Sequence, residues 1–346
     1  MRRFVVVLCA SAAVTGAAAP AATLQPDEQT TTQVRIEYGE LPSVAAKAAG
    51  SMWVLDRRGS TIGQIDPGTN DVVAQMDLKP IFGERVLAWD LDGGRGSLWA
   101  TIPARRLIVR IDPEHREIRD TIRVRERISD LYVAHGSLWF VRATRRAIVL
   151  VRLNARTGKR IAAFRLGRGN TGVTDLVSFG PSVWVVRDRA RHVRGRGRNP
   201  TFYVKASLWR IDPGSNRVKE KHPLGATYTR GAVNPVVGDV AVAPEGLWMT
   251  RVHERRILLM KPATARVLDV QPLPELDLPW YLEVLRGDVW VGDINEATIA
   301  RVDPETNATD FVDTGIVTSD LGTGFGSLWA PGTDADGGAV VRLTPE

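Results

Sequence analysis

Aspartate recurs nine residues before a tryptophan at five places in the chain. These residues are Asp90, Asp130, Asp175, Asp239 and Asp320. Carboxylates at equivalent positions of a repeated structure can hold a cation, bind a polar ligand, or accept hydrogen bonds from backbone N–H groups. The first two uses would make a binding site, whereas the third would be structural.

A second equivalent position lies three residues after each repeated tryptophan. It holds Arg142, Arg187 and Arg251 in three repeats, and Asp56 and Asp293 in two others. Carboxylates and guanidiniums mixed around a depression would suit a small polar ligand that is zwitterionic or sugar-like. Alternatively, the arginines would pair with the aspartates and the set would only stabilise the fold.

The segment 188–206 begins with a dense run of arginines. Six arginines fall within 12 residues: Arg187, Arg189, Arg191, Arg194, Arg196 and Arg198. Such a run could bind an anionic partner, such as an acidic envelope polymer or lipid headgroups. Nucleic acid is disfavoured because aromatic residues for base stacking are scarce there. The alternative is a solvated loop without a partner.

The elements that position these residues follow from an internal repeat. A turn of the type Gly-Ser-Leu-Trp occurs seven times and ends at Trp53, Trp99, Trp139, Trp184, Trp248, Trp290 and Trp329. The intervals are 46, 40, 45, 64, 42 and 39 residues. Segment 188–206 is therefore an insertion in the fourth unit, and a period near 40 is typical of propeller blades.

Each unit also contains a turn such as Ile65-Asp66-Pro67, and short segments rich in Val, Ile and Trp lie between the turns. These features predict four antiparallel strands per unit and no helix. The chain ends one strand short of a seventh blade, and residues 32–39 read as the missing strand. We therefore predict an all-β, seven-bladed propeller closed by its N-terminal strand, which removes open sheet edges.

Blade geometry brings the candidate residues to one face. The first strand of a blade starts at one mouth of the central channel, and the second strand returns to it. Five aspartates should ring that mouth, and charges of one sign that lie ~10 Å apart repel by about 0.4 to 1.7 kcal/mol per pair. Backbone N–H groups, nearby arginines or a bound cation could compensate for this repulsion.

The repeated Gly-Ser-Leu-Trp and Ile-Asp-Pro phrases resemble those of the secreted bacterial propellers of the YVTN and virginiamycin B lyase-like superfamily. The resemblance covers about residues 33 to 346. The resemblance implies the propeller fold. It also implies, as an alternative function, a streptogramin B lyase-like opening of a lactone by a histidine, carboxylates and Mg²⁺. A quinone-dependent dehydrogenase is a more distant alternative.

This chain departs from the lyase pattern at the positions of the residues that carry out the lyase reaction. The positions that match the histidine of the lyase pattern are occupied by Trp89, Ser129, Thr174, Gly238, Trp280 and Ser319. The slots of its glutamate hold Asp56, Ile102, Arg142, Arg187, Arg251, Asp293 and Gly332. Without a histidine there is no group that titrates near neutral pH to act as a general base. We therefore expect no catalytic residue, no metal site, and no cofactor unless Mg²⁺ serves the lyase alternative.

The N-terminus carries an export signal. Arg2 and Arg3 precede an apolar run that fades into small residues at about Ala21, the pattern of a cleaved signal peptide. We expect residues 1–21 to be removed, 22–31 to be flexible and 32–346 to form one domain. The only cysteine, Cys9, lies in the signal, too early for lipid attachment, so the mature chain would have no disulfide.

Taken together, the sequence predicts a secreted or periplasmic, monomeric binding module. Its formal charge is +7, with 46 basic and 39 acidic residues. No later segment is long and apolar enough to span a bilayer. The ligand, or a protein or envelope partner, would bind at the face that carries the aspartates and the arginine run.

Overall fold

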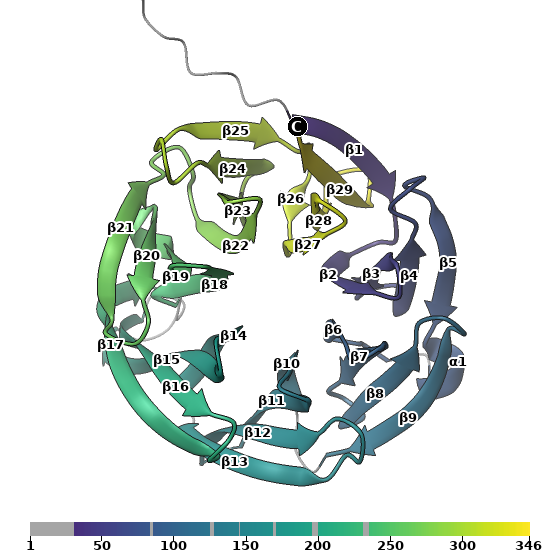
Figure 1. The fold of residues 1–346 in the computed structure, drawn as a ribbon, viewed down its shortest axis with the longest axis horizontal. Coiled ribbons are helices and arrows are strands. Elements are labelled where there is room, and N and C mark those ends of the chain that lie inside the picture. The colour runs from purple at the N-terminus through teal and green to yellow at the C-terminus, as the bar shows by residue number, and fades with distance from the viewer. Residues whose placement is uncertain are drawn as a thin grey trace, which may run out of the picture.

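The computed structural model describes residues 31–83, 86–124, 128–144, 146–168, 171–195, 200–230 and 235–346. Seven antiparallel sheets surround a central channel (Figure 1). Six sheets have four strands in sequence order, and the seventh takes its outermost strand from the N-terminal side. The predicted seven-bladed propeller is confirmed.

The strands fall into four concentric layers. The innermost strands are β2 (Pro42–Ala48), β6 (Asp90–Gly94), β10 (Ile128–Ala134), β14 (Thr171–Phe179), β18 (Val237–Ala243) and β22 (Pro279–Leu285), with β26 (Val317–Thr318) and β27 (Gly322–Gly324) sharing this position in blade 7. The second strands are β3 (Ser51–Asp56), β7 (Ser97–Ile102), β11 (Ser137–Ala143), β15 (Ser182–Arg194), β19 (Gly246–Arg251), β23 (Asp288–Asp293) and β28 (Ser327–Thr333). The third strands are β4 (Thr61–Ile65), β8 (Leu107–Asp112), β12 (Ile148–Asn154), β16 (Thr201–Asp212), β20 (Arg256–Lys261), β24 (Thr298–Val302) and β29 (Gly338–Pro345). The outer strands are β5 (Val72–Asp77), β9 (Glu117–Arg123), β13 (Arg160–Gly167), β17 (Arg217–Arg230), β21 (Arg266–Pro272), β25 (Thr309–Asp313) and β1 (Thr31–Glu37).

The ring is closed by the two ends of the chain. Strand β1 pairs antiparallel with β29, from Thr31 opposite Pro345 to Glu37 opposite Ala339. Figure 1 shows this purple strand beside the yellow strands of blade 7. The predicted closure by the N-terminal strand is confirmed, and it leaves β29 with a partner on both sides.

Two short helices depart from the expectation of none. They are α1 (Lys79–Phe82) and the 3₁₀ turn η1 (Val252–Glu254). Helix α1 has Pro80 in its first turn, where the fixed φ of proline favours helix and the missing N–H has no partner to lose. No helix in the described ranges has the length and hydropathy to cross a membrane.

The Gly-Ser-Leu-Trp phrase makes the hairpin between the first and second strands. In blade 1, Ala49 and Gly50 have φ of +43° and +74°, and in blade 2 Arg95 and Gly96 have φ of +56° and +68°. Two successive residues with positive φ form the turn whose twist matches a β-hairpin, and glycine adopts this conformation without strain. The turn directs each following tryptophan into the protein interior.

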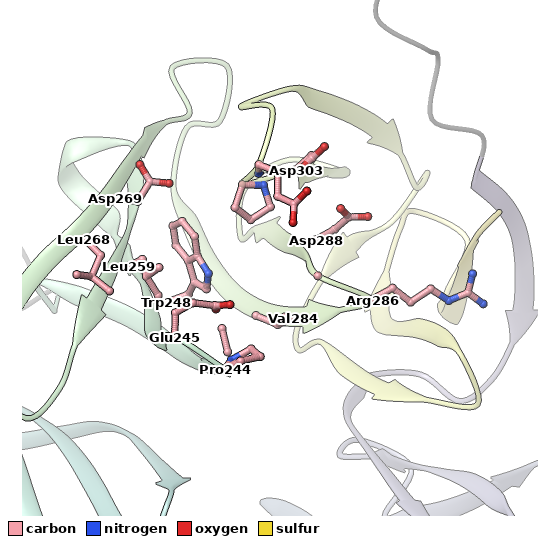
Figure 2. Close-up of a pocket in the computed structure, with 14 residues that line it drawn as sticks. Pro244, Glu245, Trp248, Leu259, Leu268, Asp269, Val284, Arg286, Asp288 and Asp303 are labelled. Carbon is pink, nitrogen blue, oxygen red and sulfur yellow. Dashed lines mark hydrogen bonds between the residues drawn. The ribbon is translucent and has the colours of Figure 1, made fainter.

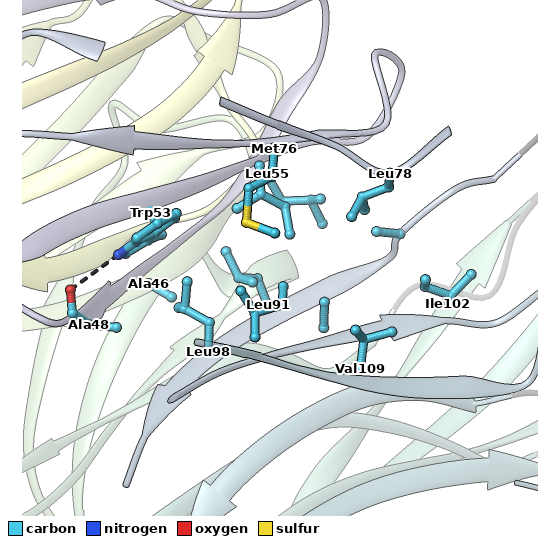
Figure 3. Close-up of a cluster of buried hydrophobic side chains, with 14 of the residues drawn as sticks. Ala46, Ala48, Trp53, Leu55, Met76, Leu78, Leu91, Leu98, Ile102 and Val109 are labelled. Carbon is cyan, nitrogen blue, oxygen red and sulfur yellow. Dashed lines mark hydrogen bonds between the residues drawn. The ribbon is translucent and has the colours of Figure 1, made fainter. Parts of the chain in front are cut away.

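The seven tryptophans are the centre of the hydrophobic packing. Each is at most 2% exposed. Figure 3 shows Trp53 between blades 1 and 2, packed in a cluster with Leu91, Leu98 and Val109, while its Nε1 donates to Ala48 O at 3.1 Å. Burying a large side chain contributes about 1.5 to 3 kcal/mol. Packing between neighbouring sheets therefore holds the ring together.

An arginine on the third strand joins one blade to the next. Arg152 stacks on Trp139 with 5.1 Å between the guanidinium carbon and the ring centroid. It donates to Ser137 Oγ at 2.9 Å and to Asn216 Oδ1 of the next blade at 2.7 Å, and it also bonds to Pro213 O. We call this arrangement the arginine clamp. The repeated Ser, Arg and Asp-Pro phrases thus serve one structural device.

The insertion of blade 4 lengthens its strands. Strand β15 pairs with β16 out to Arg194 and Thr201, and β16 pairs with β17 out to Arg230. We call the part of this sheet beyond residue 187 the ribbon. The expected loop is therefore a β-ribbon in its described part, because Phe202, Val204 and Ala206 alternate with polar residues and turn toward the protein.

Candidate functional site

Five aspartates from five blades meet at one mouth of the channel. A cavity of about 280 Å³ is lined by Asp90, Asp130, Asp175, Asp239 and Asp320, and the polar and aromatic part of its wall is completed by Tyr132, Thr174, Trp280 and Tyr281. We call it the mouth cavity. The structure therefore brings together all five positions that the spacing before tryptophan selected, including Asp320, which lies between β26 and β27.

The carboxylates accept hydrogen bonds from the backbone of the next blade. Asp90 accepts from its neighbour Leu91 N at 2.9 Å and from Leu131 N of blade 3 at 2.5 Å. Asp239 does the same with Val240 N and with Leu282 N of blade 6, at 2.8 and 2.9 Å. Of the three compensators considered above, backbone N–H groups are the ones that contact these oxygens.

The same arrangement continues around the ring. Asp175 accepts from Val240 N at 3.1 Å, and Asp320 accepts from Ala45 N of blade 1 at 3.2 Å. Each such bond joins the start of one blade to the start of the next. The aspartates therefore hold the inner ends of the blades in register, and any ligand function would be added to this role.

Burial holds these carboxyls at high pKa. Burial, together with the charge of Asp130 and against the hydrogen bonds from backbone N–H groups, raises the pKa of Asp90 to about 7. The pKa of Asp320 is raised well above its usual value by burial and by the charge of Asp239. Asp175 and Asp239 interact directly, and burial together with Asp239 raises the pKa of Asp175. Part of the ring therefore carries protons at neutral pH.

Two further acids lie one step deeper in the channel. Burial raises the pKa of Asp92 to about 7 and that of Glu283 to about 8, and the charges of Asp90 and Asp239 add to these shifts. Asp92 accepts from Val133 N at 2.6 Å. The sequence reasoning missed both residues. They stand two residues after the ring position, and the two-residue period of a strand puts them on the same face.

One arginine near the mouth was also missed. Arg57 stacks on the exposed Trp89 with 4.4 Å between the guanidinium carbon and the ring centroid, and its Nη2 donates to Trp89 O at 3.1 Å. Its charge lowers the pKa of Asp90 and of Tyr281. Arg57 follows Asp56 directly, four residues after Trp53, and only the fold brings it to Trp89.

Two of the three arginines considered as partners of the ring contact other groups. Arg251 is 7% exposed, donates to Glu254 at 3.1 Å and bonds to Leu224 O. Arg187 stacks on Trp209 at 4.7 Å. Arg142 lines a separate cavity with Arg123 and Arg160. None of the three lines the mouth cavity.

Asp56 and Asp293 are structural in their described contacts. Asp56 accepts from Glu40 N, Leu41 N and Arg58 N at 2.9 to 3.1 Å. Asp293 accepts from three backbone N–H groups in the same way, among them Leu278 N and Asn295 N, both at 2.7 Å. Each carboxylate fixes the segment that enters its blade, and neither lines the mouth cavity.

The ribbon adjoins the mouth. A second cavity of about 260 Å³ shares Thr174 and Trp280 with the mouth cavity and is walled on the ribbon side by Asp188 and Ala190. Burial raises the pKa of Asp188 to about 6, and Thr174 Oγ1 lies 2.9 Å from Asp188 Oδ2. The two cavities are therefore neighbours, with Thr174 and Trp280 in the wall of both.

The outward side of the ribbon is basic and aromatic. Arg191 lies opposite Tyr203, which lies opposite Tyr228, and Arg189 lies opposite Lys205. The two tyrosine rings are 4.9 Å apart, and Tyr228 is 64% exposed. Arg189, Arg191 and Arg194 are exposed. The other two predicted arginines of this run, Arg196 and Arg198, lie outside the described residues.

Comparison with known proteins supports the fold. No family model matches the chain, and no curated protein sequence matches it. A streptogramin B lyase structure superposes with a TM-score of 0.67 at 12% identity, covering 92% of this chain and 98% of that one. A catalytically inactive virginiamycin B lyase from Staphylococcus aureus with quinupristin gives 0.66 at 12% identity, covering 92% and 100%. The chain shares the lyase propeller fold.

A third structure shows how little that likeness says about activity. Hydrazine synthase of Kuenenia stuttgartiensis superposes with a TM-score of 0.63 at 12% identity, covering 87% of this chain and 95% of that one. Proteins with different names thus match almost equally well. The resemblance expected from the repeat phrases is confirmed for the fold, and function must be argued from the site.

The lyase resemblance implies Mg²⁺, and the described residues do not fit that ion. No group of three or more His, Cys, Asp or Glu in the described ranges is arranged to hold a metal. The ring carboxylates direct oxygens at backbone N–H groups, and a ligand set for Mg²⁺ needs free oxygens around one point. No reaction step is therefore derived through a metal.

Proposed function

We propose that this propeller is an exported binding module that takes a small polar ligand with a cationic group at its mouth cavity. The observation that carries the proposal is the cavity itself: acids from five blades meet Trp280 and Tyr281 in about 280 Å³. Aromatic faces attract ammonium groups, and buried carboxylates complement their charge.

The raised pKa values sharpen this proposal. Protonated carboxyls such as Asp90, with a pKa near 7, attract a cation less than ionised ones do. A cationic ligand should therefore displace protons from the ring, and its affinity should rise as the pH increases from about 5.5 to about 8. A neutral ligand of the same shape should not show this dependence.

Choline and its uncharged isostere 3,3-dimethyl-1-butanol make a matched pair of probes. We expect calorimetry at about pH 8 to detect choline, with at least about tenfold weaker binding of the alcohol. Trp280→Ala should weaken choline binding by about tenfold or more. Phe311→Ala is the control, because Phe311 is an exposed aromatic residue of the outer strand β25 and does not line the cavity. Equal binding of both probes would reject the proposal.

The export part rests on the N-terminal sequence. Arg2, Arg3 and the apolar run that follows precede the first described strand. Expression of the full chain in a Gram-negative host should give a periplasmic protein whose N-terminus begins at residue 22. An intact N-terminus in the cytoplasmic fraction would contradict it.

We do not extend the activity of the lyases to this chain. No histidine lines the mouth cavity, and the described acidic residues are not arranged to hold Mg²⁺. Quinupristin incubated with the protein and Mg²⁺ should keep its lactone ring, as followed by mass spectrometry. Ring opening above the buffer control would replace the binding module with an enzyme.

A further inference from the structure

The end of the propeller away from the mouth carries the repeated arginine clamps. The residue paired with the repeat tryptophan across β-strands is arginine in five blades, namely Arg110, Arg152, Arg210, Arg301 and Arg342. Their guanidinium carbons lie 4.9 to 6.0 Å from the indole centroids. At the junction of blades 1 and 2, Arg116 from the following turn reaches Gln64 instead.

Arg342 shows what the clamp recognises. Its Nε donates to Ser327 Oγ at 2.9 Å, and the far end reaches Asn70 Oδ1 at 2.8 Å and Pro67 O of the next blade. A guanidinium at such a junction is thus bound by the hydroxyl of its own blade and by the Asp-Pro turn of the next. The same partners bind Arg152.

Blade 5 lacks this arginine. Leu259 pairs with Trp248, and Gly246 replaces the serine. A side chain at Gly246 would place its Cβ 2.2 Å from Met260 O, so no hydroxyl can occupy that position without a backbone shift. The Asp-Pro turn of blade 6 is nevertheless present as Asp303-Pro304-Glu305. Among the described residues, no donor contacts Pro304 O.

A cavity of about 660 Å³ opens where that guanidinium would be. Figure 2 shows Trp248, Leu259 and Leu268 on the blade 5 side of the cavity and Asp303 on the opposite side, and the adjacent Pro304 also lines it. Leu259 fills the space of an arginine stem but stops short of the turn. One of the two contacts that a clamp arginine makes with the turn is replaced here: Gln271 Nε2 donates to Asn307 Oδ1. The contact with the proline carbonyl is not replaced by any described residue.

The charge of this cavity is strongly acidic. Its lining carries Glu245, Asp269, Asp288, Asp303 and Glu305. Asp288 is neutralised by Arg301 at 2.7 Å, and the one basic lining residue, Arg286, donates to Pro345 O at 2.6 Å and points away from the centre in Figure 2. Glu245 and Glu305 are exposed, and neither forms an ion pair within the described ranges.

We propose that this cavity binds the arginine side chain of a partner polypeptide, which supplies from outside the guanidinium that blade 5 lacks. The apolar stem would lie on Leu259 and Leu268. The planar head would reach Pro304 O and the carboxylates of Glu245 and Glu305. A planar donor fork fits a carbonyl and carboxylates better than an ammonium does. The site is at the end opposite the mouth cavity and does not depend on the function proposed above.

The test compares an arginine peptide with a citrulline peptide, in which an oxygen replaces one guanidinium nitrogen and removes the charge together with two N–H donors. Acetyl-Gly-Arg-Gly-amide and its citrulline counterpart have the same shape. By calorimetry we expect the arginine peptide to bind at least about tenfold more tightly than the citrulline peptide, and the lysine peptide to fall between them. Equal affinity of the arginine and citrulline peptides, or no binding of either at millimolar concentration, would overturn the proposal.

A substitution inside the chain gives the sharper test. Leu259→Arg should place the chain's own guanidinium in the cavity and abolish peptide binding, whereas Ile161→Arg, at an exposed position of blade 3 outside the cavity, adds the same charge and should leave peptide binding unchanged. Retained binding by folded Leu259→Arg would refute the assignment. If that variant does not fold, Glu245→Gln with Glu305→Gln, both at exposed positions, should lower the affinity about tenfold, and undiminished affinity would refute it equally.

Discussion

The two ends of the propeller use polar side chains in different ways. At the end with the arginine clamps, groups of the repeat bind one another across the junctions, most completely at Arg152 and Arg342. At the mouth, the ring aspartates also bind the next blade, but the residues around them, Thr174, Trp280 and Tyr281, follow no repeat. Residues that recur from blade to blade hold the ring together, whereas positions that depart from the repeat are candidate binding sites. The cavity at blade 5 fits the same rule.

The largest effect should come from breaking a clamp. Arg342→Ala removes the bonds that join blade 7 to the turn at Pro67 and Asn70 of blade 1, and it leaves their oxygens without this donor. We expect a loss of about 3 kcal/mol in the free energy of unfolding, measured with urea. Arg217→Ala is the control, because Arg217 is exposed. A loss below about 1 kcal/mol would mean that the junctions are held by packing alone.

The contribution of the mouth end to the stability of the protein should depend on pH. A carboxyl whose pKa is higher in the folded than in the unfolded chain stabilises the folded state. This contribution is complete below the pKa of the unfolded chain, about 4.3, and is lost as the pH rises through the pKa of the folded chain. Glu283, with a pKa of about 8, and Asp90 and Asp92, near 7, act in this direction. The protein should therefore be less stable at about pH 8 than at about pH 5.5.

Glu283→Gln isolates one of these groups. The variant cannot ionise at this position, so the loss of stability between about pH 5.5 and about pH 8 should shrink by on the order of 2 kcal/mol. Thermal unfolding at the two pH values measures it. Glu296→Gln, at an exposed position of the same blade, should behave as the wild type. An unchanged pH dependence in Glu283→Gln would show that the channel carboxyls are not buried as described.

These contrasts also explain how far the sequence could lead. The repeat spacing located Asp90, Asp175 and the other ring acids because equivalent positions of equivalent strands must meet in a closed ring. Their partners were not predictable: Asp90 bonds to a residue 41 positions later and Asp175 to one 65 positions later. Bulges that no residue type announces, such as the one between Ser129 and Leu131, decide which N–H faces each carboxylate.

The missed and misplaced residues have the same origin. The alternative that Arg142, Arg187 and Arg251 pair with the ring came from their shared face, but local partners decide the contacts of Arg187 and Arg251. Arg251, for example, turns to Glu254 three residues away. Glu283 stands outside the aspartate pattern, and Arg57 reaches the mouth only by stacking on Trp89, 32 residues later.

A smaller effect is expected at the ribbon, which belongs to the mouth end but carries the opposite charge. Changing Arg189, Arg191 and Arg194 together to serine should weaken retention on heparin by about tenfold at low salt, with less difference at high salt because the charges are screened. Serine at the exposed Arg156, Arg217 and Arg266 removes the same charge elsewhere. If both triple variants lose retention equally, net charge and not the ribbon binds the anionic partner.

The smallest effect should come from the exposed bond that stands in place of a clamp at the junction of blades 1 and 2. Arg116→Ala removes a bond from Nη1 to Gln64 Oε1 that is 3.4 Å long and open to solvent. We expect a change of at most about 0.5 kcal/mol in the urea midpoint analysis, because water replaces an exposed bond at little loss. A loss approaching that of Arg342→Ala would mean that a guanidinium stabilises every junction regardless of burial. The junction of blades 5 and 6 would then be a weak point of the ring, and a bound arginine peptide should raise the unfolding temperature.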